Sequence, residues 1–114
     1  MIELPFPPKA LWPNGRAHWA VKHRATTSAN LAAFMSMKGY LATMQAPAVP
    51  ARLVFTIHPK PFGPEPDRDN CVSAMKAYQD GISAALGIND RTLAEPRIIM
   101  GERCKGGAVI VEVE

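Results

Sequence analysis

The positions of proline constrain the fold of this chain more than any other feature of its sequence. Eleven prolines occur among 114 residues, and ten of them lie in three clusters, over residues 5–13, 47–50 and 59–66. Proline fixes φ and lacks a backbone N–H, so it is rare inside helices and in central strands. The three clusters therefore predict loops, and the helices and strands must lie between them.

Alternating apolar residues predict a short strand over residues 2–6 and a second strand over residues 52–58. Residues 8–23 predict a long loop, a length that is uncommon unless the loop is functional or disordered. Trp12 and Trp19 in this loop can pack against the body of the protein or stack on a ligand. Packing is the simpler interpretation.

Two segments carry helical periodicity. The first spans residues 27–45, where Thr27 or Ser28 can cap the helix, and its apolar side is expected to comprise Leu31, Phe34, Met35, Leu41 and Met44. The second spans residues 70–86 and ends before Gly87, which suits the C′ position. Its core side is expected to comprise Val72, Met75, Gln79, Ile82 and Leu86.

The C-terminal residues predict a hairpin. Residues 97–103 and 108–113 are expected to pair across a turn at residues 105–107, where two glycines stand together. The elements then follow the order βαβαββ. We therefore expect residues 1–114 to form a single small α+β domain with two helices and a mixed sheet.

Composition excludes several classes of protein. Hydrophobic residues make up 47% of the chain, so disorder is not expected. No apolar run spans a bilayer and the N-terminus lacks the regions of an export signal, so we expect a cytoplasmic protein without a membrane partner. Cys71 and Cys104 form no CxxC pair, so buried or unreactive thiols are expected.

Carboxylates gather around the second predicted helix. Asp67 and Asp69 precede it, and Asp90 follows it shortly after Gly87. At 100° per residue, one side of this helix, distinct from its core side, carries Asp69, Ser73, Lys76 and Asp80. A hard cation such as Mg²⁺ needs only two or three such carboxylates, because it retains several waters.

The combination of carboxylates and a lysine suits phosphodiester hydrolysis. A metal ion held by Asp67, Asp69 and Asp90 polarises the phosphoryl group and activates a water, and Lys76 stabilises charge on the phosphate. Each feature also has a structural explanation. One Asp can cap the helix, Lys76 and Asp80 can form a surface ion pair, and Asn89-Asp90 can be a turn.

Charge is segregated along the chain. Residues 4–64 contain seven bases and no acid, whereas residues 65–114 contain six bases and nine acids. Such segregation can place a basic surface for phosphates beside an acidic pocket for cations, or it can leave a solvated positive face without a partner. Arg16, Lys22 and Arg24 are the candidates for phosphate contacts, by charge and position.

These motifs resemble the RusA family of Holliday-junction resolvases over nearly the whole chain. The similar segments are Leu4-Pro5-Phe6-Pro7-Pro8, Asp67-Arg68-Asp69-Asn70, Lys76-Ala77-Tyr78-Gln79-Asp80-Gly81 and Leu86-Gly87-Ile88-Asn89-Asp90. The chain departs from the family in two places. Ser73 stands where the family lysine is usual, with Lys76 one turn later on the same face, and Asn89 replaces the first acid of an Asp-Asp turn.

The resemblance implies a homodimeric endonuclease that depends on Mg²⁺, with Mn²⁺ as a substitute, and that cuts four-way DNA junctions by paired symmetric nicks. Such enzymes act in DNA recombination and repair and are common in phages. Asp67, Asp69 and Asp90 would hold metal, Lys76 would act on the phosphate, and Arg68 and Asn70 would lie at the DNA. A four-way junction has two-fold symmetry, so paired nicks require two active sites and therefore two chains. The first helix and the hairpin can supply the interface between these chains.

Two alternatives remain open at this point. The chain can be a module that binds branched DNA without cutting it. It can also be a structural protein whose acidic segment caps a helix, in which case it has no affinity for DNA even at low salt.

Overall fold

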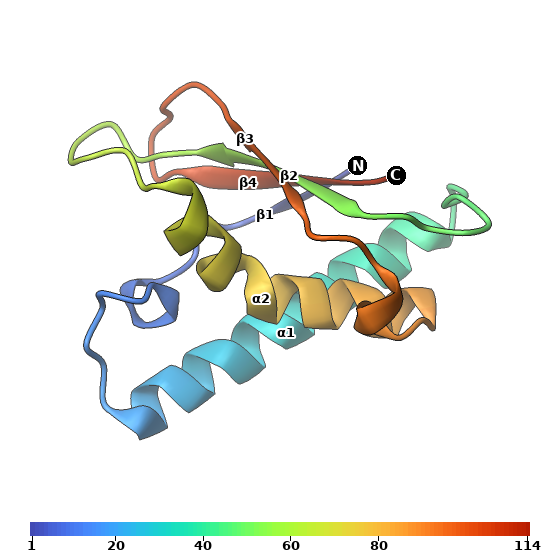
Figure 1. Cartoon of the computed structure of the whole chain (residues 1–114), viewed down its shortest axis with the longest axis horizontal. Helices are drawn as coiled ribbons and strands as arrows, with labels where there is room; N and C mark the ends of the chain where they lie inside the picture. The colour runs from blue at the N-terminus through green and yellow to red at the C-terminus, as the bar shows by residue number, and fades with distance from the viewer.

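The computed structural model describes all 114 residues as one layer of strands over one layer of helices (Figure 1). Its strands and α-helices follow the predicted order βαβαββ, with two short 3₁₀ helices added. The elements are β1 (Ile2–Leu4), η1 (Lys9–Leu11), α1 (Trp19–Leu41), β2 (Leu53–His58), α2 (Arg68–Leu86), η2 (Asp90–Thr92), β3 (Arg97–Met100) and β4 (Ala108–Val113). The single α+β domain is confirmed.

The sheet is mixed and has the strand order β1-β4-β2-β3. Strand β4 pairs antiparallel with both β1 and β2, and β2 pairs in parallel with β3. In the registers Phe55↔Val111 and Ile57↔Val109, buried side chains lie opposite one another on the same face of the sheet. The mixed sheet predicted from the sequence is therefore present.

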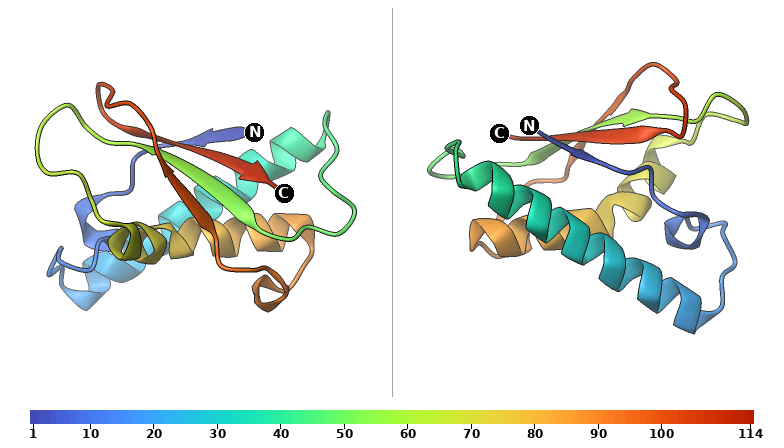
Figure 2. Two further views of the ribbon diagram at one scale, coloured as in Figure 1. Left: turned by 45° about the horizontal axis from the view of Figure 1, so that its top comes forward. Right: turned by 180° about the vertical axis from the view of Figure 1, so that it is seen from behind.

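Both helices cover the same face of this sheet, as the two further views show (Figure 2). The core lies between the layers and includes Phe55, Ile57, Val109 and Val111 from the sheet, Met75, Tyr78 and Ile82 from α2, and Ala29, Ala33 and Met37 from α1. Helix α2 buries one side against α1 and the sheet, and its opposite side, with Asp69, Ser73 and Lys76, is exposed. The hydroxyl of Tyr78 donates a hydrogen bond of 2.6 Å to the carbonyl oxygen of Pro5, which fixes the segment after β1 to this helix.

The boundaries of α2 match their sequence signals. Asp67 is the N-cap, and Gly87 ends the helix in the left-handed conformation at φ 73°. A glycine adopts this conformation without the steric cost that a Cβ atom brings. Met75 and Ile82 of the predicted core side are buried, whereas Val72, Gln79 and Leu86 are only partly buried.

The first helix begins earlier than predicted and buries a different side. It starts at Trp19 rather than at Thr27 or Ser28, so the predicted loop over residues 8–23 is wrong in its last five residues. His18 is the cap, and its Nδ1 atom accepts a hydrogen bond from the backbone N–H of Ala20. Residues 19–26 lack an apolar stripe, which is why periodicity did not reveal them.

The buried side of α1 differs from the predicted one. Ala29, Ala33 and Met37 recur every four residues and are buried, while Leu31, Met35 and Met44 are exposed and Phe34 and Leu41 are half-buried. Where α1 crosses α2, the two helices lie very close together. A Cβ atom at Gly81 of α2 would overlap the backbone carbonyl oxygen of Asn30 in α1, so only small side chains such as that of Ala33 fit at this crossing.

The predicted C-terminal hairpin is also wrong in its pairing. A turn does occur before β4, where the N–H of Gly107 bonds to the carbonyl oxygen of Cys104, and Gly106 and Gly107 both have positive φ. The strands on either side of this turn do not pair, because β2 lies between them. The two glycines allow the chain to reverse its direction before β4. The strand that pairs with β4 on this side is β2 and not β3.

Neither helix is long and apolar enough to span a membrane.

Candidate functional site

The proline-rich loop before α2 is held in place by Arg103. Its Nη1 atom donates to the carbonyl oxygens of Lys60 and Gly63, at 3.0 and 2.9 Å. At the beginning of the loop, the backbone N–H of Cys104 bonds to the carbonyl oxygen of Pro59. The loop therefore delivers the Asp67 motif to a defined position, as its prolines predict.

Asp67 and Asp69 lie exposed at the beginning of α2. The Oδ1 atom of Asp67 accepts a hydrogen bond of 2.8 Å from the backbone N–H of Asn70. This bond satisfies one of the free N–H groups of the first turn. Asp69 lies in the first turn, where the helix dipole favours negative charge. Asp67 thus has the structural role that the sequence left open, and its second carboxylate oxygen remains available.

Two substitutions separate the stabilisation that Asp67 provides as an N-cap from the stabilisation that its charge provides. We expect Asp67→Ala to lower the free energy of unfolding by about 1 kcal/mol, because the N-cap bond is lost. Asp67→Asn is expected to cost about 0.5 kcal/mol or less, because Asn caps as well as Asp and only the charge at the helix dipole is removed. Urea denaturation without added metal measures both values. Equal losses for the two variants would show that the charge, and not the cap, stabilises the helix.

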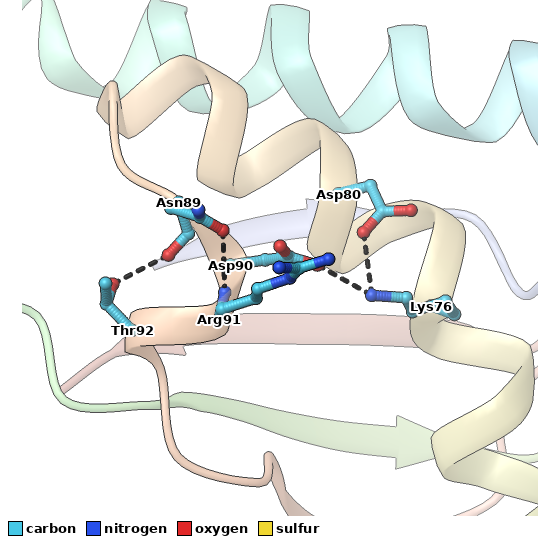
Figure 3. Close-up of polar contacts among 6 residues, drawn as sticks. All are labelled: Lys76, Asp80, Asn89, Asp90, Arg91 and Thr92. Carbon is cyan, nitrogen blue, oxygen red and sulfur yellow. Dashed lines mark hydrogen bonds and ion pairs between the residues drawn. The ribbon is translucent and has the colours of Figure 1, made fainter.

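Lys76 joins α2 to the turn that follows it (Figure 3). Its Nζ atom lies 2.7 Å from Oδ2 of Asp90 and 3.0 Å from Oδ1 of Asp80. The hydrogen bonds to Asp90 and Asp80 raise the pKa of Lys76, and the hydrogen bond from Lys76 lowers the pKa of Asp90. The predicted pair of Lys76 and Asp80 is present, and Asp90 extends it to three charged groups.

The turn that carries Asp90 is organised by Asn89. The side-chain oxygen of Asn89 accepts from the backbone N–H of Arg91 at 3.0 Å, and the hydroxyl of Thr92 donates to the carbonyl oxygen of Asn89 at 2.6 Å (Figure 3). Asn89 is therefore the cap of the short helix η2. Asn89 therefore has a structural role in this turn, which holds Asp90 beside Lys76.

The ion pair predicts a stability that depends on pH. Folding lowers the pKa of Asp90 from its ordinary value of 3.8, so this contribution exists above that value and is lost as the pH falls through the folded pKa. Folding raises the pKa of Lys76 from 10.5, so its contribution exists below that value and is lost as the pH rises through the folded pKa. The pair is therefore fully formed at neutral pH.

We expect Asp90→Asn to destabilise the protein at neutral pH and to have no effect in strong acid, where Asp90 itself is protonated. Urea denaturation of both proteins across the acid range measures this difference. Glu3→Gln removes an exposed acid that has no ion pair and serves as the control. A loss that persists unchanged in acid would mean that the turn, and not the charge, is responsible.

The three candidate metal ligands do not meet at one point. The carboxylate of Asp90 contacts Lys76. Lys76 follows Asp69 by seven residues along α2, which corresponds to about 10 Å of helix. No group of three acidic, histidine or cysteine side chains is close enough to hold one metal ion. Asp67 and Asp69 supply two carboxylates, which is a sufficient protein share for Mg²⁺ with retained waters. Asp90 does not join them in this arrangement.

The candidate phosphate contacts lie in different places. Lys22 faces a groove between α1 and α2 that is also lined by Thr26, Ser73, Lys76 and Asp80. Arg24 contacts the backbone of its own helix, and Arg16 lies before α1 with a positive φ of 48°. Arg68 pairs with Glu95 at 3.2 Å. Only Lys22 among these basic residues shares a groove with Lys76.

The ion pair of Lys76 and Asp80 was among the structural alternatives that the sequence offered, and the spacing of four residues on α2 was the signal for it. One feature of the site was not among the sequence candidates. A second groove opens beside Asp67 and includes aromatic side chains from the N-terminal segment and from the loop before α2.

Cys71 is buried at the start of α2, where burial and then the charges of Asp67 and Glu65 raise the pKa of its thiol to about 11. The burial expected for this thiol is confirmed.

The fold and this site define a small α+β protein with an acidic, capped helix start and a lysine held between two carboxylates. The chain is 35% identical over 117 residues to an uncharacterized protein of Xylella fastidiosa, and the match covers 98% of this chain and 74% of the relative. It belongs to the same family as that protein. No protein-family model matches the chain.

Proposed function

We propose that this protein is a metal-dependent, structure-selective DNA endonuclease of the RusA type. It would resolve four-way junctions by paired nicks during DNA recombination and repair. The observation that carries the proposal is the meeting of two separate RusA-like segments. Lys76 from α2 and Asp90 from the turn after Gly87 lie 2.7 Å apart, although fourteen residues separate them in the chain.

The beginning of α2 would hold the metal. Asp67 and Asp69 are exposed there, and the loop that precedes them is fixed by Arg103. A bound Mg²⁺ or Mn²⁺ would supply a Lewis acid and a water of lowered pKa for attack on the phosphodiester. The role of the protein would be to fix the two carboxylates and to keep the phosphate close to them.

Lys76 would bind the DNA backbone from the groove between α1 and α2. The groove contains two ammonium groups, those of Lys22 and Lys76, together with the hydroxyl of Ser73. The hydroxyl of Thr26 also lines it but already donates to the carbonyl oxygen of Lys22. Ammonium groups attract phosphates, and the Ser73 hydroxyl can donate a hydrogen bond to one. A strand lying in this groove would pass along α2 toward its acidic start. Asp80 and Asp90 hold Lys76 until a phosphate competes for it.

Neutralising Lys22 tests this path. We expect Lys22→Gln to lower the log–log slope of DNA affinity against salt by about one unit, because one phosphate contact and its counterion release are lost. The same loss is expected for Arg16→Gln and Arg24→Gln if these residues reach the DNA. Fluorescence anisotropy with a labelled junction over a salt series gives the slope. Lys38→Gln at the other end of α1 is the control, and a slope unchanged by Lys22→Gln would remove Lys22 from the interface.

The proposed enzyme would act as a homodimer. A four-way junction has two-fold symmetry, and each chain would carry one site, so two chains related by a dyad would cut the two opposed strands. Leu31 and Met35 leave apolar side chains exposed one turn apart on α1, at 59% and 63%. Such an exposed apolar pair is typical of a surface that another chain covers.

One observation favours a second candidate, a module that binds branched DNA without cutting it. The three candidate metal ligands, Asp67, Asp69 and Asp90, do not gather around one point. A protein of this kind would retain the basic groove and would have no cleavage activity.

One experiment separates the two functions. A synthetic four-way junction and a linear duplex of the same sequence are incubated with the protein, with and without Mg²⁺ or Mn²⁺. Nicks in the junction that require metal support the endonuclease. Tight binding to the junction with no product under any condition supports the binding module, and no binding to either DNA at low salt contradicts both.

A further inference from the structure

A groove beside Asp67 has no role in the site described so far. It has a volume of about 380 Å³ and lies between the N-terminal segment and the loop that precedes α2. Its walls include the aromatic side chains of Phe6, Trp12 and Phe62, and the polar groups of Asn14, Lys60 and Asn70. The loop stands out from the body at the N-terminal end of α2 (Figure 1). A groove of this size is within the range that holds a small organic group.

One wall of the groove is a pair of stacked rings. The ring centroids of Phe6 and Trp12 are 5.4 Å apart, and the indole Nε1 of Trp12 donates to the carbonyl oxygen of Pro7. The ammonium group of Lys60 lies 5.7 Å from the centroid of Phe6. This wall is therefore fixed, partly apolar and positively charged at one edge.

The other wall carries a phenylalanine that contributes nothing to the core. Phe62 is 91% exposed, although its loop is held by the two hydrogen bonds from Arg103 to the residues on either side of it. An exposed aromatic ring on a fixed loop gains no stability from burial. The fixed loop therefore holds the ring of Phe62 in solvent at the mouth of the groove.

We propose that this groove holds one unpaired base of a DNA strand, with Phe62 stacked on its face. The proposal rests on the endonuclease or DNA-binding function proposed above and names how the strand is gripped next to Asp67. A base is flat and aromatic, so it stacks on a ring whatever its identity. Lys60 would attract the adjoining phosphate, and the amides of Asn14 and Asn70 can donate to and accept from a base edge.

The charges of the groove favour a neutral base over an anionic group inside it. Glu65 and Asp67 line the same groove as Lys60, so a phosphate placed deep within it would meet two carboxylates. The base occupies the aromatic part, and the backbone phosphate stays at the edge near Lys60. An unpaired base is available where strands exchange at a branch point, and unstacking there costs least.

The test measures the affinity for a short oligothymidylate and for a branched DNA that carries 2-aminopurine at the branch point, by anisotropy and by fluorescence. No cleavage is needed for either measurement. Four variants are compared with the original protein: Phe62→Ala, Phe62→Leu, Phe62→Trp and Val49→Ala. Val49 is 86% exposed and belongs to the loop between α1 and β2, so it controls for the loss of an exposed apolar side chain. Phe62 is outside the core, so its variants are expected to fold.

We expect Phe62→Ala and Phe62→Leu to bind the oligothymidylate about 5- to 140-fold more weakly, which is the loss of one stacked base. Phe62→Trp and Val49→Ala should bind as the original protein does. The 2-aminopurine fluorescence should be quenched by the original protein, by Phe62→Trp and by Val49→Ala, and not by Phe62→Ala or Phe62→Leu. If Phe62→Leu binds as tightly as Phe62→Trp, stacking is not the interaction and the proposal is wrong.

The outcomes also separate this proposal from the function on which it rests. If the original protein binds both DNAs and Phe62→Ala does so equally well, the groove does not hold a base and the DNA function stands. If the original protein binds no DNA at low salt, the DNA function fails and the groove proposal fails with it.

Discussion

Replacing Asp69 by Asn is expected to reduce the metal-dependent nicking of a four-way junction by about 100-fold or more. The reason is the loss of one of two carboxylates that would hold the ion, whose charge stabilisation is worth several kcal/mol in the transition state. Binding to the junction should survive, because the basic groove between α1 and α2 is unchanged. Single-turnover cleavage of a labelled junction gives the rate, and anisotropy gives the affinity.

The controls for Asp69→Asn follow from its position. Asp69 is exposed in the first turn of α2, so the variant is expected to fold, and urea denaturation checks this. Glu112→Gln on β4 removes an exposed acid away from the site and should cut at the original rate. Nicking by Asp69→Asn at an undiminished rate would falsify the assignment of this carboxylate to the metal, whatever the function of the protein.

Replacing Gly81 by Ala is expected to destabilise the protein by about 2 kcal/mol or more, although alanine is the better helix former. The added methyl group would overlap the backbone carbonyl oxygen of Asn30, which belongs to α1 and cannot rotate away. The two helices must move apart, and the buried line of Ala29, Ala33 and Met37 loses its contacts with α2. The gain in helix propensity, about 1 kcal/mol, is smaller than this cost.

Gly39 provides the matched control within the other helix. No atom lies within 4 Å of the position that its Cβ would occupy. Gly39→Ala should therefore stabilise the protein by about 0.5–1 kcal/mol, since it brings only the propensity gain. Thermal and urea denaturation of the two variants should shift in opposite directions. Equal stabilisation by both substitutions would mean that α1 and α2 are not packed as closely as described.

The second helix and its boundaries could be predicted because their signals are local. Asp67 caps the helix through the backbone three residues ahead, and Gly87 ends it by its own conformation. Lys76 and Asp80 also meet through helix geometry alone. The pairing of Lys76 with Asp90 could not be derived in this way. It depends on how the turn organised by Asn89 folds back along α2.

The early start of α1 was missed because its first residues carry no apolar stripe, and the other two errors concern contacts between distant segments. The buried side of α1 was assigned to its largest apolar residues, because such residues usually face a core. In the structure only small side chains such as that of Ala33 fit where α1 crosses α2 at Gly81. The two glycines before β4 indicate a reversal, but the identity of the strand beside β4 depends on β2, which lies fifty residues earlier in the chain. Sequence patterns carry little information on such choices.

The place of β4 in the sheet affects how the domain can fold. Strand β4 pairs with β1 on one side and with β2 on the other, so it joins residues 108–113 to residues 2–4 and 53–58. Both pairings connect segments that lie far apart in the sequence, and closing such long loops costs entropy before the contacts are gained. Until β4 is in place, β1 has no partner strand. We therefore expect the sheet to form in one cooperative step, after the helices.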